Sequence, residues 1–297
     1  MATIKLFRSY DEQVELLKSR GMNVGDSEEA AGHLRQVNYY RLSGYWYPFR
    51  QIVDGRRADS FYPGTTLADV LALYHFDASL RMATFGALVP IELTVRALLG
   101  HALGRIGERA HLDRAVLGAR ARQPAYEDWI TRLDKEVSES HEDFVEHHRQ
   151  KYGGEMPVWA AVEVLDWGGL TKLYGFSPRA VQDDVATQFN LRAPQLESWL
   201  KSLNIVRNVC AHHGRLFNRV FALAPKLPTP GRFPDLDQAA SFTRTFGHLT
   251  MIQFLLDSRG LRRTLLPSVM KTFPQVKSVP VSHTGAPNGW DASPLWK

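Results

Sequence analysis

The sequence predicts an all-α protein. Apolar residues recur at spacings of three and four in several long stretches, whereas the alternation of apolar and polar residues that marks strands is scarce. The chain has 297 residues, of which 44% are hydrophobic and 23% are charged, an ordinary globular balance that allows a sizeable core. We expect a helical bundle with a small N-terminal helical extension and an irregular C-terminal tail.

Residues 1–66 are expected to form the extension. A short helix is predicted over residues 11–19, followed by the aromatic stretch NYYRLSGYWYPFR. Its mixture of aromatic and basic side chains suits single-stranded RNA, with Arg41 as a candidate contact. The same spacing also suits a packing face, so both interpretations stay open. That face would hold Tyr39, Tyr40, Leu42, Tyr45 and Trp46.

Residues 67–258 are expected to form the main helical body. Apolar periodicity predicts helix over residues 67–103, where Thr66 can cap the start and Pro90 either begins a second helix or kinks a single one. Further helices are predicted over residues 126–148, 158–173, 194–213 and 242–256. The proline-rich segment 225–235 is expected to be a surface loop.

The tail, residues 259–297, is expected to be irregular. From Val276 onward it is rich in proline, glycine and serine, yet it carries Trp290 and Trp296. Because tryptophan is rarely left in a disordered tail, we expect this segment to pack against the body or against a partner subunit.

Composition excludes several classes of protein. A single cysteine excludes an internal disulfide bond and a zinc site built from several cysteines. The N-terminus turns polar too early for a signal peptide, and no apolar run reaches the roughly 18 residues that cross a bilayer. We therefore expect a cytoplasmic protein without membrane contact. The net charge of +5 permits a nucleic-acid partner without demanding one.

The stretch IVRNVCAHHGRLFNR, at the end of the helix predicted over residues 194–213, holds the candidate chemistry. Cys210 continues the apolar stripe of that helix, so we expect it in the core and not as a nucleophile. Asn208 and His212 are one turn apart on the polar side. Gly214 is expected to end the helix at His213.

Arg207 and His212 are five residues apart, which places them about 140° apart around a helix. They can reach one target only if the long arginine curls over or if a second copy of the chain faces the first. His212 and His213 point about 100° apart and make a poor chelating pair, so no metal site is expected.

Histidine, arginine and asparagine can together cleave RNA without a metal. The histidine transfers protons, the arginine stabilises the charge that develops on phosphorus, and the 2′-hydroxyl of the substrate is the nucleophile. A polar helix end without function is the alternative that spacing alone leaves open.

RNVCAH, Arg207 to His212, resembles the signature of HEPN-domain ribonucleases, in which four to six residues separate an arginine from a histidine. The longer string RNVCAHHGRLFNR resembles the Abi-like subgroup, the AbiD/AbiF type of bacterial abortive-infection proteins. Four further strings resemble that subgroup in the same order, so the resemblance spans residues 38–296. They are NYYRLSGYWYPFR, LYHFDASLRMATFGALVPIELTVRALL, MPVWAAVEVLDWGGLTKLY and NGWDASPLW.

The resemblance implies a HEPN-like helical bundle that dimerises, with the two motifs meeting in a shared cleft. It implies metal-independent, cofactor-free endoribonuclease activity that leaves a 2′,3′-cyclic phosphate, and a toxin-like role in anti-phage abortive infection. Its catalytic residues would be Arg207, Asn208 and His212. A noncoding RNA is a further possible partner that it implies.

Other residues are weaker candidates. The resemblance implies an acidic residue near the motif, for which Glu92 is the candidate; Glu92 can pair with Arg96 on one helix turn, and that pair can equally be a surface ion pair. His213 is a candidate supporting residue, and Arg215 and Arg219 are candidate RNA contacts. A catalytically silent RNA-binding module and a purely structural helical protein are the alternative functions.

Overall fold

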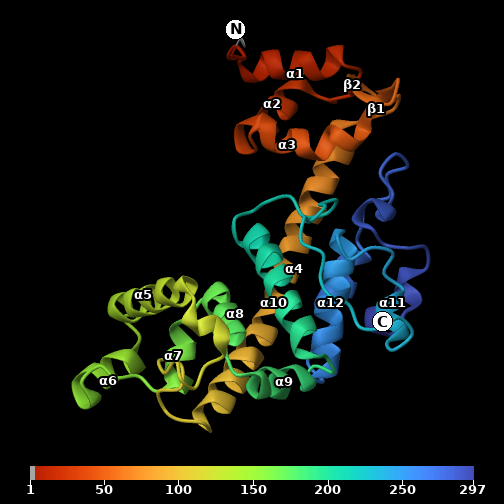
Figure 1. Cartoon of the computed structure of the whole chain (residues 1–297). Helices are drawn as coiled ribbons and strands as arrows, with labels where there is room; N and C mark the ends of the chain where they lie inside the picture. Colours follow the sequence, from red (N-terminus) through yellow and green to blue (C-terminus); the bar gives the residue numbers. More distant parts are fainter. Residues whose placement is uncertain (1–3) are drawn as a thin grey trace.

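The computed structural model describes residues 4–297, and the all-α prediction is confirmed within that range. It contains thirteen α-helices, five short 3₁₀ helices and one two-stranded hairpin (Figure 1). The fully buried side chains include Trp46, Trp129, Trp167, Trp199 and Trp296, which are distributed along the whole chain. The division of the chain at residues 66 and 258 stays a prediction.

The N-terminal region lies at one end of the long helix α4 (Figure 1). It contains α1 (Tyr10–Ser19), α2 (Ser27–Gln36), α3 (Tyr39–Trp46) and the 3₁₀ helix η1 (Tyr47–Phe49). Strands β1 (Arg50–Val53) and β2 (Arg56–Phe61) form an antiparallel hairpin that the sequence analysis missed. Asp54 and Gly55 form its turn with φ of 49° and 73°, which is the two-residue turn that an Asp-Gly pair favours.

Helix α4 (Leu67–Gly104) is the axis of the molecule. The Thr66 hydroxyl accepts a hydrogen bond from the Asp69 N–H at 3.0 Å, which confirms the predicted cap. The helix continues through Pro90, so the possibility of a second helix starting there is wrong. The Thr94 hydroxyl donates to the Pro90 carbonyl at 2.7 Å within this continuous helix.

By length and composition α4 could cross a membrane, because an 18-residue window of it has a mean hydropathy of 1.5. Seven other helices of the described chain contact it, however, namely α3, α7, α8, α9, α10, α12 and α13. Two ion pairs, Asp77–Arg81 and Glu92–Arg96, also lie along α4 and are largely buried. This is the arrangement of a central core helix.

Two predicted helices are each broken in two. The first consists of α5 (Pro124–Glu139) and α6 (Asp143–Tyr152), separated where Ser140 adopts an extended conformation. The second consists of α7 (Val158–Val164) and α8 (Trp167–Phe176), and the Asp166 carboxylate caps α8 by accepting from the Gly169 N–H at 2.7 Å. Asp and Ser favour helix starts because their side chains satisfy free N–H groups, which local periodicity does not register.

The remaining elements complete the body and its tail. Helix α10 (Ala193–Ala211) and helix α12 (Thr245–Ser258) pack on α4 and on each other. In the tail, Trp296 is buried and stacks on Phe246 of α12 at 4.7 Å between ring centroids. The other elements are η2 (Ala119–Arg122), α9 (Arg179–Thr187), α11 (Pro234–Asp237), α13 (Leu265–Met270), η3 (Val281–Thr284), η4 (Trp290–Ala292) and η5 (Pro294–Trp296).

Candidate active site

The candidate motif lies at the C-terminal end of α10. Cys210 is buried there, and burial raises the pKa of its thiol to about 12, as expected for a core residue. The helix ends at Ala211, and His213 adopts the left-handed conformation, with φ of 56°. The expectation that Gly214 ends the helix at His213 is therefore wrong. The Gly214 N–H instead donates to the Val209 carbonyl at 2.8 Å and closes the helix end.

Arg207 and His212 lie on different sides of this helix end. Arg207 is half-buried, and its guanidinium lies over the ring of Phe85 on α4, 5.3 Å from the centroid. Its Nε is buried and has no hydrogen-bond partner among residues 4–297. Asn208 and His212 are exposed. No hydrogen bond joins Arg207 to His212 in the described chain, in agreement with the 140° separation.

A cleft of about 660 Å³ lies between α3 and the segment that follows α10. His212 and His213 lie on its wall, and Arg207 is not among its lining residues. The structure thus brings His212 together with Arg41, Arg215 and Arg219. The cleft is lined by Tyr40, Arg41, Ser43, Gly44, Tyr45, His212, His213, Gly214, Arg215, Asn218, Arg219 and Val220.

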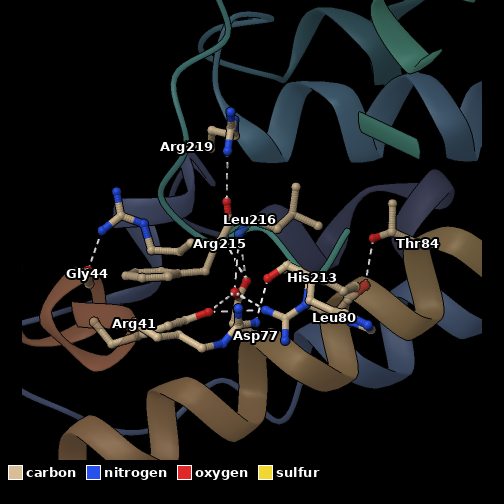
Figure 2. Close-up of polar contacts among 12 residues, drawn as sticks. Arg41, Gly44, Asp77, Leu80, Thr84, His213, Arg215, Leu216 and Arg219 are labelled. Carbon is tan, nitrogen blue, oxygen red and sulfur yellow. Dashed lines mark hydrogen bonds and ion pairs between the residues drawn. The ribbon is translucent and has the colours of Figure 1, made fainter. Parts of the chain in front are cut away.

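Hydrogen bonds cross this cleft in both directions (Figure 2). Arg41 of α3 donates to the His213 carbonyl at 2.5 Å, and Arg215 donates to the Gly44 carbonyl of α3. Gly44 has no side chain, and a Cβ there would lie 3.2 Å from the Arg215 guanidinium. The small residue therefore allows the arginine to lie close against α3.

The cleft is strongly basic. It contains three arginines, and none of its lining residues is a carboxylate. Within the described chain, none of these arginines forms an ion pair. Burial lowers the pKa of Arg215, and the neighbouring Tyr45 and Asp77 oppose that shift. A bound anion would supply the missing negative charge.

Asp77 of α4 fixes the segment after α10, a role that the sequence analysis missed. Its buried carboxylate accepts from the backbone N–H groups of Leu216 at 3.2 Å and Phe217 at 2.7 Å, and from the Tyr45 hydroxyl at 2.7 Å (Figure 2). It also pairs with Arg81 at 2.5 Å. Burial raises the pKa of the Asp77 carboxyl, and these donors oppose the rise. An Asp and an Arg four residues apart within an apolar helix were the available signal.

Glu92 and Arg96 lie farther along α4 and connect it to α7. The two side chains pair at 2.5 Å, and the Arg96 guanidinium also donates to the carbonyls of Val162 at 2.6 Å and Glu163 at 2.9 Å. In the described part of the chain, no hydrogen bond joins this pair to the motif on α10. A supporting role for these residues in catalysis stays a prediction.

An exposed apolar stripe runs along α4 beside Arg207. Met82, Val89 and Leu93 have 77%, 41% and 54% of their surface exposed. Phe85, which lies under the Arg207 guanidinium, is separated from Met82 by three residues and from Val89 by four, so it borders this stripe. Arg207 therefore lies at the edge of an apolar surface that residues 4–297 leave exposed.

A family model described as Abi-like protein matches residues 32–218, which is more than half of the chain. The matched range begins in α2 and ends at Asn218, and it contains Arg41, Asp77, Arg207 and His212. Comparison with curated proteins and with solved structures found no match.

Proposed function

Because the chain belongs to the Abi-like protein family, which suggests a role in abortive infection and defence, we propose that it is a metal-independent endoribonuclease of the HEPN type. Abortive infection requires an activity that stops the growth of the infected cell. RNA cleavage meets that requirement, and the residues around the α10 end are those that such a reaction needs.

In the proposed reaction, a 2′-hydroxyl of the RNA attacks the adjacent phosphorus, and the bond to the 5′-oxygen of the next nucleotide breaks. His212 transfers protons to and from these oxygens, a contribution of about 10²–10⁴ in rate for a well-placed group. Arg207 stabilises the additional negative charge at phosphorus, and Asn208 orients the phosphate or the ring. The products carry a 2′,3′-cyclic phosphate and a 5′-hydroxyl.

We place Arg207 of one protomer against His212 of another. Two observations support this arrangement. Arg207 and His212 point to different sides of one chain, and Arg207 borders the exposed stripe of Met82, Val89 and Leu93. Exposed apolar surface of this kind is typical of protein interfaces. A second copy of the chain that covers the stripe would bring its own side chains next to the Arg207 guanidinium.

The observation that carries the proposal is an exposed histidine on the wall of a cleft with three arginines and no carboxylate. The test is cleavage of single-stranded RNA in the presence of EDTA by the wild type and by His212→Ala. We expect the wild type to leave cyclic phosphate ends, and His212→Ala to be at least about 10²-fold slower.

His147 supplies the matched control, because it is an exposed histidine in another His-His pair, away from the cleft. His147→Ala should cleave like the wild type. RNA with a single deoxynucleotide at the cleaved position should resist cleavage there. Full activity of His212→Ala, or cleavage of the deoxy position, would refute the proposed chemistry.

A catalytically silent RNA-binding module, held with a noncoding RNA, is the second candidate. The separation of Arg207 from the cleft within one protomer favours it, because a chain that stays monomeric could bind RNA without assembling the pair. This candidate predicts that the wild type co-purifies with intact RNA and that its expression does not stop growth.

A further inference from the structure

We propose that the cleft between α3 and residues 212–220 is a subsite for single-stranded RNA, in which one base stacks on Tyr40 and the neighbouring phosphates bind Arg41, Arg215 and Arg219. The subsite would hold the nucleotides next to the phosphodiester bond whose cleavage His212 assists by proton transfer, so its relevance to cleavage rests on the proposed function. The role of α3 would then be to select unpaired RNA.

Tyr40 is the aromatic residue of α3 that faces away from the core. On the same helix Leu42, Tyr45 and Trp46 are buried, whereas Tyr40 has 62% of its surface exposed and lines the cleft. Its ring lies 5.9 Å from that of Tyr39 in an edge-to-face contact. The expectation that all five residues form one packing face is therefore wrong for Tyr40. The Lys5 ammonium lies over this ring, 5.4 Å from its centroid, and the exposed remainder of the ring is available to a base.

The arginines of the cleft retain unused donors. A guanidinium carries five N–H donors. Arg41 and Arg215 each make one hydrogen bond, to a carbonyl on the opposite wall. The Arg219 guanidinium donates a long hydrogen bond of 3.5 Å to the Arg215 carbonyl and lies over the Phe221 ring, 5.7 Å from its centroid. The first two bonds hold the guanidinium groups in place, and the remaining N–H groups can bind phosphate oxygens.

Nothing on the cleft wall neutralises this charge. The carboxylate of Asp77 contacts the wall from behind, and it is already occupied by two backbone N–H groups, the Tyr45 hydroxyl and Arg81. A phosphodiester chain supplies regularly spaced negative charges and forms strong, charge-assisted bonds with guanidinium groups. The cleft volume of about 660 Å³ is in the range of small-ligand sites, so it can receive a nucleotide.

Unpaired RNA suits this surface better than a duplex. Stacking on an aromatic side chain needs a base whose face is free, and single-strand binders combine such rings with a basic groove. In an A-form duplex the bases are stacked on each other, and the protein meets mainly phosphates and 2′-hydroxyls. The pairing of Tyr40 with three arginines therefore predicts a preference for single strands.

The test is fluorescence anisotropy with a labelled 2′-O-methyl RNA of about ten nucleotides, which the protein cannot cleave by 2′-hydroxyl attack, in EDTA. Tyr40→Ala should weaken binding about tenfold or more, and Tyr40→Phe should bind like the wild type because it keeps the ring. Arg219→Ala should weaken binding and reduce the slope of log affinity against log salt by about one.

Two matched controls lie outside the cleft in the same N-terminal region. Tyr47 is an exposed aromatic residue and Arg56 is an exposed arginine of the hairpin, and neither lines the cleft. Tyr47→Ala and Arg56→Ala should bind like the wild type. With a blunt duplex of the same length, Tyr40→Ala should also bind like the wild type.

The inference is overturned if Tyr40→Ala and Arg219→Ala bind the single strand as tightly as the two controls do, or if Tyr40→Ala weakens the duplex equally. Because the 2′-O-methyl probe cannot be cleaved, the binding assay tests the subsite independently of whether the protein cleaves RNA. A wild type that binds through Tyr40 but leaves natural RNA intact would refute the cleavage and support the subsite.

Discussion

Helix α4 carries two pairs of an acidic residue and an arginine one turn apart, and the pairs serve different parts of the molecule. Asp77–Arg81 is buried, with side-chain exposures of 0% and 7%, and it holds the segment after α10 through two backbone N–H groups. Glu92–Arg96 is less buried, with exposures of 16% and 11%, and it holds the end of α7 through two carbonyls. The first pair positions the cleft, and the second fastens a neighbouring helix.

The difference lies in which member makes the long-range bonds. In the first pair the carboxylate contacts distant backbone, so removing Asp77 leaves the two N–H groups without an acceptor. Arg81 would lose its counter-ion and keep its hydrogen bond to the Tyr45 hydroxyl at 3.1 Å. In the second pair the arginine makes those contacts, so removing Glu92 still leaves Arg96 bound to Val162 and Glu163. The two pairs have the same spacing in the sequence, yet we expect loss of the Asp77 carboxylate to cost more stability than loss of the Glu92 carboxylate.

The largest expected effect is that of Asp77→Ala. It should lower the free energy of unfolding by about 3–5 kcal/mol, because it leaves a buried guanidinium unpaired. Urea denaturation at pH 7 measures the change. Tyr45→Phe is the matched variant, since it removes one donor to the same carboxylate and should cost about 1–2 kcal/mol. A loss below about 1 kcal/mol for Asp77→Ala would contradict the proposal that Asp77 holds the segment after α10 in place.

A drop in pH should also weaken the fold, by about 2 kcal/mol between pH 7 and pH 5 for His111 alone. Burial lowers the pKa of His111 to about 4, and burial likewise lowers the pKa of His248. The unfolded chain takes up these protons near pH 6.5, whereas the folded chain stays neutral, so stability falls as the pH drops below about 6.5. Denaturation curves across this range measure the slope.

The two histidines lie in different parts of the fold, so variants can separate their contributions to the pH dependence of stability. His111 lies after α4 and its carbonyl accepts from Tyr126, whereas His248 lies beside Ser202 of α10, 2.8 Å from its hydroxyl. His111→Leu should reduce the pH dependence, and replacement of the exposed His147 by alanine should not. An unchanged slope in His111→Leu would show that this histidine is not kept neutral by the fold.

The smallest expected effect is that of Glu92→Ala, about 1–2 kcal/mol in the free energy of unfolding. We expect RNA cleavage to stay within about threefold of the wild-type rate, since Glu92 pairs with Arg96 and no hydrogen bond in the described chain joins this pair to the motif on α10. Cleavage assays with the purified variant measure this. A loss of about 10² or more would instead assign Glu92 a direct part in catalysis.

Patterns within a short stretch of sequence were sufficient to predict the structural features that depend on residues close together in the sequence. Helical periodicity and the Thr66 cap predicted α4, and the apolar stripe of α10 predicted the burial of Cys210. The Asp54-Gly55 hairpin was equally readable from its turn pair but was missed. Gly214 was expected to end the helix at His213, because glycine is the commoner residue after a helix end, whereas His213 itself adopts the left-handed conformation.

Structural features that depend on contacts between residues far apart in the sequence could not be predicted from such patterns. The two backbone N–H groups that Asp77 binds are 139 and 140 residues away in the sequence, so no local spacing predicts that Asp77 holds the segment after α10. Tyr40 and Tyr45 both suited a packing face, and only the docking of α3 on α4 shows that Tyr45 is buried and Tyr40 exposed. The cleft arises from the same docking.

The most direct test of the two-chain site is to mix two inactive variants, Arg207→Ala and His212→Ala, after brief dissociation. If each site takes its arginine from one protomer and its histidine from the other, a mixed dimer contains one intact site. Random pairing makes half of the dimers mixed, so we expect about a quarter of the wild-type cleavage rate to return. A mixture as inactive as either variant alone would contradict the account.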